Sequence, residues 1–486
     1  MAAEAMTRLR SGGVRSVKYV STRGLAPALG FSDVLLAGLA RDGGLYVPES
    51  WPHFTASDLS ALAGKPYDEA AFALIRPFIG GEIDDVALRG MCRAAYSTFR
   101  HPAVAPLVQT GPNDFILELF HGPTLAFKDV AMQLLARLMD HVLAKRGERA
   151  TIVGATSGDT GGAAIEAFRG RNATDIFILF PKGRVSPVQQ RQMTTVAEAN
   201  VHAIAVEGTF DDCQAIVKAL FNDHRYRDRV KLSGVNSINW ARIMAQLVYY
   251  VTAALSLGAP ARAVSFTVPT GNFGDVFAGY VAKRIGLPIE SLVIATNTND
   301  ILARTVETGR YETSAVVPTT SPSMDIQVSS NFERLLFDAV GRDGETVRRL
   351  LGSLSQSGAF TLPEGALAAI RVEVAAGRAS EDETAAVMRS MLAECSYLAD
   401  PHTAVALAVA ARQERSSAPM VTLSTAHPAK FPVAVEAATG IWPDLPAMAG
   451  DLMQREERFV VLPNDVGAVA EFVEARTRAV EERVQS

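Results

Sequence analysis

The chain has 486 residues, which at roughly 150 residues per domain allows about three domains. Hydrophobic residues make up 48% and charged residues 20%, and this ordinary globular composition excludes a disordered, fibrous or coiled-coil protein. Acidic and basic residues are interspersed, and 47 Lys and Arg against 52 Asp and Glu give a net charge of −5. Because such a chain has no basic field to bind a phosphate backbone, no nucleic-acid partner is expected.

The cysteines and the apolar runs exclude further classes. Cys92, Cys213 and Cys395 lie far apart without CxxC or Cys/His spacing, so neither a disulfide framework nor a metal site is expected. The best apolar run, residues 247–255, is about half the length of a membrane span, so no membrane partner is expected. Residues 1–16 lack the apolar region of a secretory signal, which favours a loose N-terminus over a transit peptide, and the remainder predicts a cytoplasmic protein.

The first block, residues 17–101, predicts a small N-terminal domain. It opens with a strand-like piece at 17–22, continues with an amphipathic stretch at 31–40, and turns at 41–48. No catalytic grouping is found in it, so we expect a packing or lid domain.

In residues 102–440 the hydrophobic pattern changes, and it predicts an α/β catalytic core. Short apolar runs, each followed by a loop and a helix-period segment, occur at 150–155, 175–180, 201–206, 264–268, 291–295 and 420–423. Apolar strands that alternate with helices indicate a parallel sheet covered on both faces. Residues 375–384 are expected to be a surface connection and helix start, and residues 441–486 a C-terminal helical segment. Ligands of such sheets bind at the carboxyl ends of the strands.

Residues 118–129 form the first segment whose side chains could take part in catalysis. A turn at Gly122 and Pro123 precedes a predicted helix that ends at Gly147. Lys128 falls in the first turn of this helix, where the helix dipole disfavours a cation. A lowered pKa there suits an amine that attacks a carbonyl group, although a snorkelling surface lysine has the same pattern.

Three further loops follow predicted strands. The glycines and hydroxyls of residues 154–162 suit the binding of a carboxylate or phosphate. A tight strand-to-helix turn without a ligand would have the same pattern. The segment matches neither the GxxxxGK[ST] nor the GxGxxG nucleotide-binding loop. Residues 269–275 predict an anion-binding nest, with Asp275 capping the next helix. In residues 423–431 a hydroxyl can enter a cleft, and His427 is equally compatible with a structural and a catalytic role.

Five segments together resemble the threonine synthase family of fold-type-II enzymes that depend on pyridoxal 5′-phosphate (PLP). They are HGPTLAFKD, GATSGDTGGAA, NSINWARI, PTGNFGDVFAGY and LSTAHPAKF, in this order along the chain. The resemblance covers residues 17–439 and is to the long form of the family. It implies two open parallel-sheet αβα subdomains, a small N-terminal α+β domain, and PLP as the cofactor.

The resemblance also implies roles for individual residues. Lys128 would form the Schiff base with PLP and act as the base, Thr425 would face the pyridine nitrogen, and Asp159 would lie near the 3′-oxygen, where the short form has asparagine. The loop for the cofactor phosphate would be Gly271, Asn272, Phe273, Gly274 and Asp275. The expected substrate contacts are Thr124, Ser157, Gly158 and Thr160, with Lys182, Asn239 and Arg242 for the substrate phosphate. For Arg242 and Lys182 a surface role remains open.

The implied reaction converts O-phospho-L-homoserine and water to L-threonine and phosphate, by γ-elimination and then β-addition of water, as the last step of threonine biosynthesis. A related phospho-lyase that releases 2-oxobutyrate and ammonia would share the cofactor motifs. An NAD-dependent oxidoreductase is disfavoured because this sequence lacks a GxGxxG turn. A non-catalytic protein is also disfavoured, because packing alone would require neither Lys128 nor residues 271–275. The protein is expected to be a monomer or weak homo-oligomer.

Overall fold

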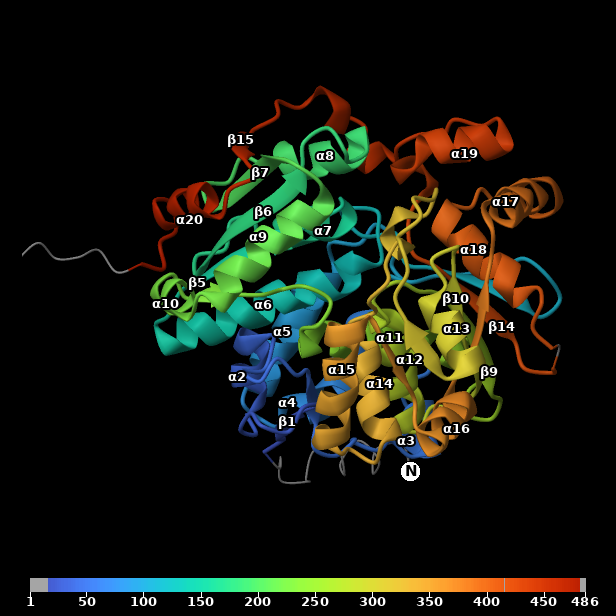
Figure 1. Ribbon diagram of the computed structural model, residues 1–486. Coiled ribbons are helices and arrows are strands. Elements are labelled where there is room, and N and C mark those ends of the chain that lie inside the picture. Colours follow the sequence, from blue (N-terminus) through green and yellow to red (C-terminus); the bar gives the residue numbers. More distant parts are fainter. Residues whose placement is uncertain (1–15, 415, 481–486) are drawn as a thin grey trace, which may run out of the picture.

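The computed structural model describes residues 16–414 and 416–480 and shows two sheets side by side above a smaller N-terminal part (Figure 1). The predicted loose N-terminus at 1–16 lies outside the described residues, apart from its last position. The predicted α/β fold with two largely parallel sheets is confirmed. None of the helices in the described part of the chain has the length and apolar character needed to cross a membrane.

The N-terminal part is a small α+β unit, as predicted. It consists of β1 (Tyr19–Ser21), α2 (Phe31–Ala37), β2 (Tyr46–Pro48), α3 (Ala56–Ser60), α4 (Tyr67–Ile79) and α5 (Asp85–Tyr96), with β1 and β2 antiparallel. Its aromatic rings pack against the core, since the ring centroids of Tyr19 and Trp51 lie 5.8 and 6.1 Å from that of Trp240. Trp240 is fully buried, so this contact joins the unit firmly to the core.

The larger sheet has six strands in the order β13-β10-β9-β14-β4-β3. Only the edge strand β3 is antiparallel. The strands are β3 (Leu107–Gln109), β4 (Asp114–Glu118), β9 (Val264–Pro269), β10 (Ile289–Thr296), β13 (Ala375–Arg378) and β14 (Met420–Ser424). Helices α11 (Trp240–Ser256), α12 (Gly274–Arg284) and α13 (Ile301–Thr308) pack on one face, and α18 (Pro401–Ala410) packs on the other.

Strand β13 corrects the expectation that residues 375–384 are a surface connection. Residues 375–378 pair in parallel with β10, and only the helix start that follows, α17 (Glu381–Cys395), was predicted correctly. The strand lacks β-branched residues, but a side chain on Gly377 would come within 2.8 Å of Val409 in α18. The small residues of this segment therefore allow close packing of the strand against α18, and they do not indicate a loop.

The smaller sheet has five parallel strands in the order β15-β7-β6-β5-β8. They are β5 (Ala150–Ala155), β6 (Thr174–Pro181), β7 (Val201–Glu207), β8 (Leu232–Ser233) and β15 (Val460–Pro463). On β6, Phe177 and Leu179 face α9 (Phe210–Asn222) and α20 (Val466–Glu474). The alternate residues Ile176 and Ile178 face α6 (Lys128–Arg146) and α7 (Asp159–Phe168). Both faces are covered, which explains why the strand is apolar throughout.

The predicted C-terminal helical segment at 441–486 is only partly helical. It contains α20, but also β15, which pairs in parallel with β7 and forms an edge of the smaller sheet. The C-terminal segment is therefore part of the α/β core and is not a separate helical extension after it. The remaining elements are α8 (Pro187–Thr194), α10 (His224–Arg229), β11 (Arg310–Glu312), η1 (Pro322–Met324), α14 (Phe332–Ala339), α15 (Gly344–Ser357), β12 (Ala359–Thr361), α16 (Glu364–Glu373), η2 (Pro428–Lys430), α19 (Pro432–Thr439), η3 (Ala447–Ala449) and η4 (Leu452–Gln454).

Candidate active site

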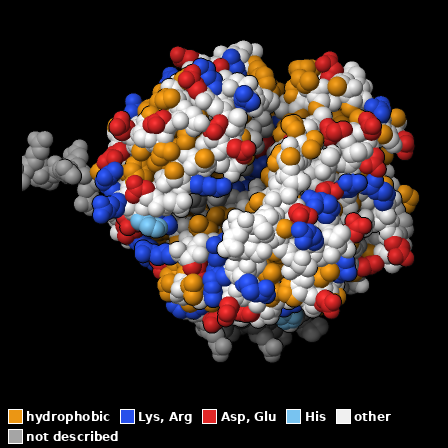
Figure 2. Space-filling model, in the orientation of Figure 1, with side chains coloured by type: hydrophobic (Ala, Val, Ile, Leu, Met, Phe, Trp, Pro, Cys, Tyr) orange, Lys and Arg blue, Asp and Glu red, His pale blue; other side chains and the backbone are white. Residues whose placement is uncertain are grey.

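The predicted loops converge at the carboxyl ends of the parallel strands, where the two sheets face each other. Figure 2 shows a hollow between the lobe of the smaller sheet, at upper left, and the rest of the molecule, with Lys and Arg side chains on its walls. Backbone hydrogen bonds join two loops here that are far apart in sequence, the one before Lys128 and the one after β14. Phe127 N–H donates to Thr425 O at 2.8 Å, and His427 N–H donates to Leu125 O at 3.0 Å.

Lys128 is the first residue of α6 and is only 8% exposed, so it is not a snorkelling surface lysine. Its Nζ lies 3.3 Å from Asp159 Oδ2. Burial lowers the pKa of Lys128, and the charges of Lys430 and Arg242 lower it further, while Asp159 opposes them. The lowered pKa agrees with the prediction, but burial is its main cause rather than the helix dipole.

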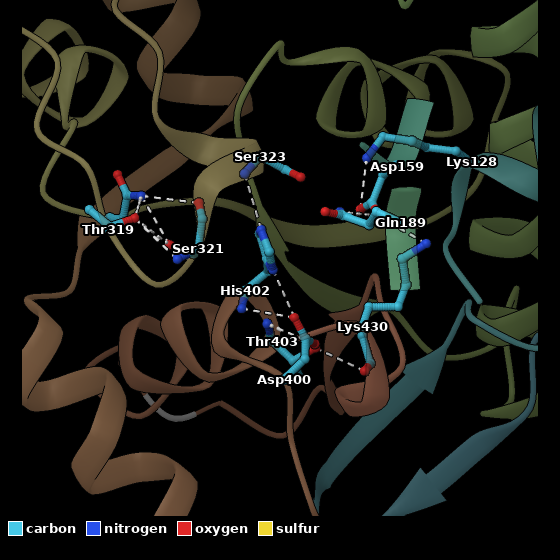
Figure 3. Close-up of polar contacts among 12 residues, drawn as sticks. Lys128, Asp159, Gln189, Thr319, Ser321, Ser323, Asp400, His402, Thr403 and Lys430 are labelled. Carbon is cyan, nitrogen blue, oxygen red and sulfur yellow. Dashed lines mark hydrogen bonds and ion pairs between the residues drawn. The ribbon is translucent and has the colours of Figure 1, made fainter. Parts of the chain in front are cut away.

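Asp159 begins α7 and lies at the centre of a buried charge cluster (Figure 3). Its Oδ1 accepts a hydrogen bond from Gln189 Nε2 at 2.8 Å and lies 3.0 Å from Lys430 Nζ. Burial alone would raise the pKa of Asp159, but the charges of Lys430 and Lys128 hold it well below its usual range. Asp159 is therefore an anion shared between two ammonium groups.

Lys430 is part of this cluster, and we did not single it out in the sequence. It is fully buried in η2, and its Nζ also donates to Thr124 O at 2.7 Å and Gln192 Oε1 at 2.8 Å. The lysine stands within the LSTAHPAKF segment, so its position was visible in the sequence. Its burial was not, because that depends on α7 and α8, more than 200 residues away in the chain.

The loop 271–275 adopts the conformation that an anion nest requires. Phe273 has φ 63° and is the N-cap of α12. The loop is held through its carbonyl groups: Gly271 O accepts from Ser329 Oγ at 2.6 Å, and Asn272 O accepts from Asn331 N–H at 3.0 Å. Amides in the first turn of a helix have no intrahelical partners, so those at the start of α12 remain suited to an anion.

Asp275 does not cap α12, which corrects the prediction from sequence. The N-terminus of α12 has no side-chain cap. Instead, Asp275 Oδ1 accepts hydrogen bonds from Tyr249 Oη at 2.5 Å and Tyr250 Oη at 2.9 Å. Burial raises the pKa of Asp275 to about 6, against these bonds and the charge of Lys128. Hydrogen bonds from two tyrosines of α11 thus fix the orientation of this carboxyl group.

The loop 154–162 differs in detail from the expected carboxylate site. Thr156 Oγ1 accepts from the N–H groups of Gly158 and Gly161, each at 2.9 Å. The Gly158 amide is therefore used within the loop, and its φ of 142° is a conformation that favours glycine. Ser157 and Thr160 are half-buried and remain compatible with contact to a substrate.

The structure gives Thr124 and Lys182 other partners than a substrate. Thr124 Oγ1 donates to Asp129 Oδ1 at 2.7 Å, and Thr124 N–H donates to Oδ2 of the same carboxylate at 2.7 Å. This pair holds the turn before Lys128. Lys182 is exposed and pairs with Glu207 at 3.2 Å, because the chain turns outwards after β6. Neither side chain is retained as a substrate ligand.

The side chains of Asn239 and Arg242 have different environments, although the residues are three positions apart. Asn239 is the N-cap of α11: its Oδ1 accepts from Ala241 N–H at 3.1 Å, and its Nδ2 donates to Leu35 O at 2.9 Å. It is thus a structural residue. Arg242 is 3% exposed, and its Nε and Nη1 have no partner among the described residues. Burial lowers the pKa of this guanidinium to about 10.

Thr425 and His427 follow β14. Thr425 is 6% exposed, and its carbonyl group is the acceptor for Phe127 N–H. His427 is the N-cap of η2, where its Nδ1 accepts from Ala429 N–H at 3.2 Å. Burial lowers the pKa of His427 to about 4, so it is neutral near pH 7. These contacts give His427 a structural role.

Family models match most of the chain. "Threonine synthase N terminus" matches residues 18–96, "Pyridoxal-phosphate dependent enzyme" 108–377, and "Threonine synthase, C-terminal" 403–473. A curated threonine synthase of Pseudomonas aeruginosa is 55% identical over 94% of this chain and 98% of its own length.

Two solved structures are similar over the whole fold. PLP-bound threonine synthase from Brucella melitensis is 67% identical, with a TM-score of 0.93 over 95% of this chain and 100% of that one. The yeast enzyme is 40% identical, with a TM-score of 0.90 over 96% and 99%.

The chain belongs to the threonine synthase family. Its cofactor is pyridoxal 5′-phosphate, and the residues of the site fit this group. A buried amine with a lowered pKa suits the aldehyde, and the loop at the start of α12 suits the phosphate. Gly271 belongs to a tight cradle, because a Cβ there would lie 2.5 Å from Ser323 O. Among the described residues, no group of three or more His, Cys, Asp or Glu could hold a metal ion.

Proposed function

We propose that this member of the threonine synthase family converts O-phospho-L-homoserine and water to L-threonine and phosphate through the residues of this site. One observation carries the assignment. Buried Lys128, with its lowered pKa, shares the site with Arg242, whose guanidinium has buried N–H groups without a partner among the residues that the structure describes. A reactive amine beside an unpaired buried cation suits a substrate with a phosphate leaving group.

Bound PLP would supply the electron sink that stabilises negative charge on the substrate carbons. Lys128 is proposed to take the proton from Cα and then to move a proton at Cβ, because its lowered pKa makes the neutral amine accessible. The phosphate group would receive charge-assisted hydrogen bonds from Arg242. Residues 271–275 and Thr425 would hold the cofactor, and Ser157 and Thr160 would orient the substrate carboxylate.

Product analysis tests this function. Purified protein is incubated with O-phospho-L-homoserine, and amino acids, keto acids, ammonia and phosphate are measured together. Equal amounts of threonine and phosphate are expected. Formation of 2-oxobutyrate and ammonia in place of threonine would show a phospho-lyase instead.

We also propose a cytoplasmic location and a monomer or weak homo-oligomer. The absence of a spanning helix in the described residues is compatible with this location. Light scattering across a range of protein concentrations measures the assembly state.

A further inference from the structure

Lys430 is a buried cation that has no role in the proposed reaction. It is 0% exposed, and its Nζ lies 2.7 Å from Thr124 O, 2.8 Å from Gln192 Oε1 and 3.0 Å from Asp159 Oδ1. An ammonium group has three donors, and three protein acceptors surround this one. Lys430 is therefore not available to bind a ligand, and it can act only through its partners and through its charge.

The partner that reaches the reactive amine is Asp159. One carboxylate oxygen faces Lys430, and the other lies 3.3 Å from Lys128 Nζ (Figure 3). Lys128 must lose its positive charge to act as a base. A buried carboxylate without a cationic partner is strongly unfavourable, so without Lys430 the Asp159 carboxylate would hold the proton on Lys128 and oppose that loss of charge.

We propose that Lys430 is a positioning residue: it pairs with the Asp159 carboxylate and keeps it aimed at Lys128, so that the Lys128 amine can lose its charge without leaving Asp159 unpaired. This inference rests on the assignment of Lys128 as the reactive amine in the proposed function. The charge of Lys430 also lowers the pKa of Lys128 by repulsion, after the larger effect of burial. Lys430 thus both favours the neutral amine and pairs the carboxylate that remains.

Other charged groups face the same pair from the elements packed around it. Arg242 of α11 also lowers the pKa of Lys128, and Lys128 in turn acts on Asp275 of α12. His402 of α18 faces Asp159 and contributes to lowering the pKa of that carboxyl group. The test must therefore separate Lys430 from a general change in the site.

The test is the pH dependence of Lys128 acetylation in the full-length chain after removal of bound cofactor. The protein is treated with acetic anhydride at a series of pH values, and mass spectrometry gives the fraction modified at Lys128. In Lys430→Met the midpoint should shift to higher pH, because the Asp159 carboxylate then depends on the charge of Lys128 and a repelling positive charge is lost. In Asp159→Asn it should shift to lower pH, because the attractive charge is lost.

Opposite shifts distinguish a charge relation from a merely structural role. Lys182→Met, which removes an exposed lysine paired with Glu207, should leave the midpoint unchanged. A folded Lys430→Met with an unchanged or lower midpoint would overturn the inference. If this variant does not fold, Lys430→Gln, which keeps a donor for Thr124 O, replaces it under the same criterion. Because acetylation requires no turnover, failure of this inference is separate from failure of the proposed function.

Discussion

At the scale of single residues, the site is defined by buried polar groups that lack a simple structural explanation. A lysine at the first position of a helix is unfavourable for folding alone. So is an arginine with buried N–H groups that find no partner in the described part of the chain. Asn239, Thr124 and Lys182, in contrast, have protein partners that account for them. The difference separates functional from structural candidates more sharply than residue type does.

Replacement of Lys128 should abolish activity and leave the fold intact. In Lys128→Ala we expect turnover to fall by a factor of about 10³ or more, since positioned acid–base groups contribute factors of this order. Phosphate release from O-phospho-L-homoserine measures the loss, and circular dichroism checks the fold. Lys182→Ala is the matched control on the surface. Near-normal turnover in Lys128→Ala would contradict the assignment.

Replacement of Arg242 should weaken the handling of substrate phosphate. Loss of a charge-assisted hydrogen bond costs about 1.5–3 kcal/mol, so Arg242→Ala should lower kcat/KM about tenfold to a hundredfold. Part of the loss should appear in kcat, because the phosphate is the leaving group. Arg242→Lys should recover only part, since lysine cannot make bidentate contacts.

The control for this experiment is Arg310→Ala, which removes an exposed arginine paired with Glu312. Absorption of the bound cofactor should be unchanged in all these variants. Unchanged kinetics in Arg242→Ala would exclude the role, and loss of the cofactor band would assign Arg242 to the cofactor instead.

At the scale of elements, strand ends and helix starts meet to form the site. The loop after β9 has a positive φ at Phe273, and its carbonyl groups are tied to Ser329 and Asn331. These ties come from residues 58 and 59 positions later in the chain. The loop is therefore a preformed cradle, and its tightest point is Gly271.

Two alanine substitutions in this loop should have different effects. A Cβ at Gly271 would lie 2.5 Å from Ser323 O, whereas at Gly274 its nearest neighbour is Asn331 Nδ2 at 3.4 Å. Overpacking costs about 1–3 kcal/mol, so Gly271→Ala should raise the Kd for PLP about tenfold or more. Gly274→Ala is the matched control and should change it less. Absorbance titration measures both, and equal affinities would contradict the packing argument.

At the scale of the whole molecule, the end of the chain returns to close the smaller sheet. Strand β15 pairs with β7, and Val469 and Val473 of α20 are fully buried against α9 and the sheet. The lobe that carries the loop with Asp159 therefore depends on residues about 300 positions further along the chain. Its stability should be sensitive to substitutions in α20.

A pair of substitutions in α20 tests this dependence. Val469→Ala removes two methyl groups from a buried site and should cost about 2–3 kcal/mol of stability. Val466→Ala, at a residue 40% exposed, should change stability by less than about 0.5 kcal/mol. Thermal unfolding followed by circular dichroism compares them. Equal melting temperatures would show that α20 does not support the lobe.

The sequence by itself determined the alternation of strands and helices and the loops at the strand ends, whereas Lys128 was predicted as the reactive residue from the family resemblance. These features depend on local patterns, such as apolar runs of strand length and glycines before a helix. Helix α6 could be predicted to end at Gly147 for the same reason, because a helix stop is encoded within a few residues.

Only the tertiary structure decided which polar groups are buried and what they face. Lys430 contacts the carbonyl group of Thr124 across 306 positions, and Asp275 accepts hydrogen bonds from tyrosines of another helix, so neither contact leaves a local pattern. Strands β13 and β15 were missed for a related reason. The residues of β13 have low strand propensity and form a strand because β10 and α18 pack against them. Strand β15 begins with two valines, but its place in the sheet depends on pairing with β7, far earlier in the chain.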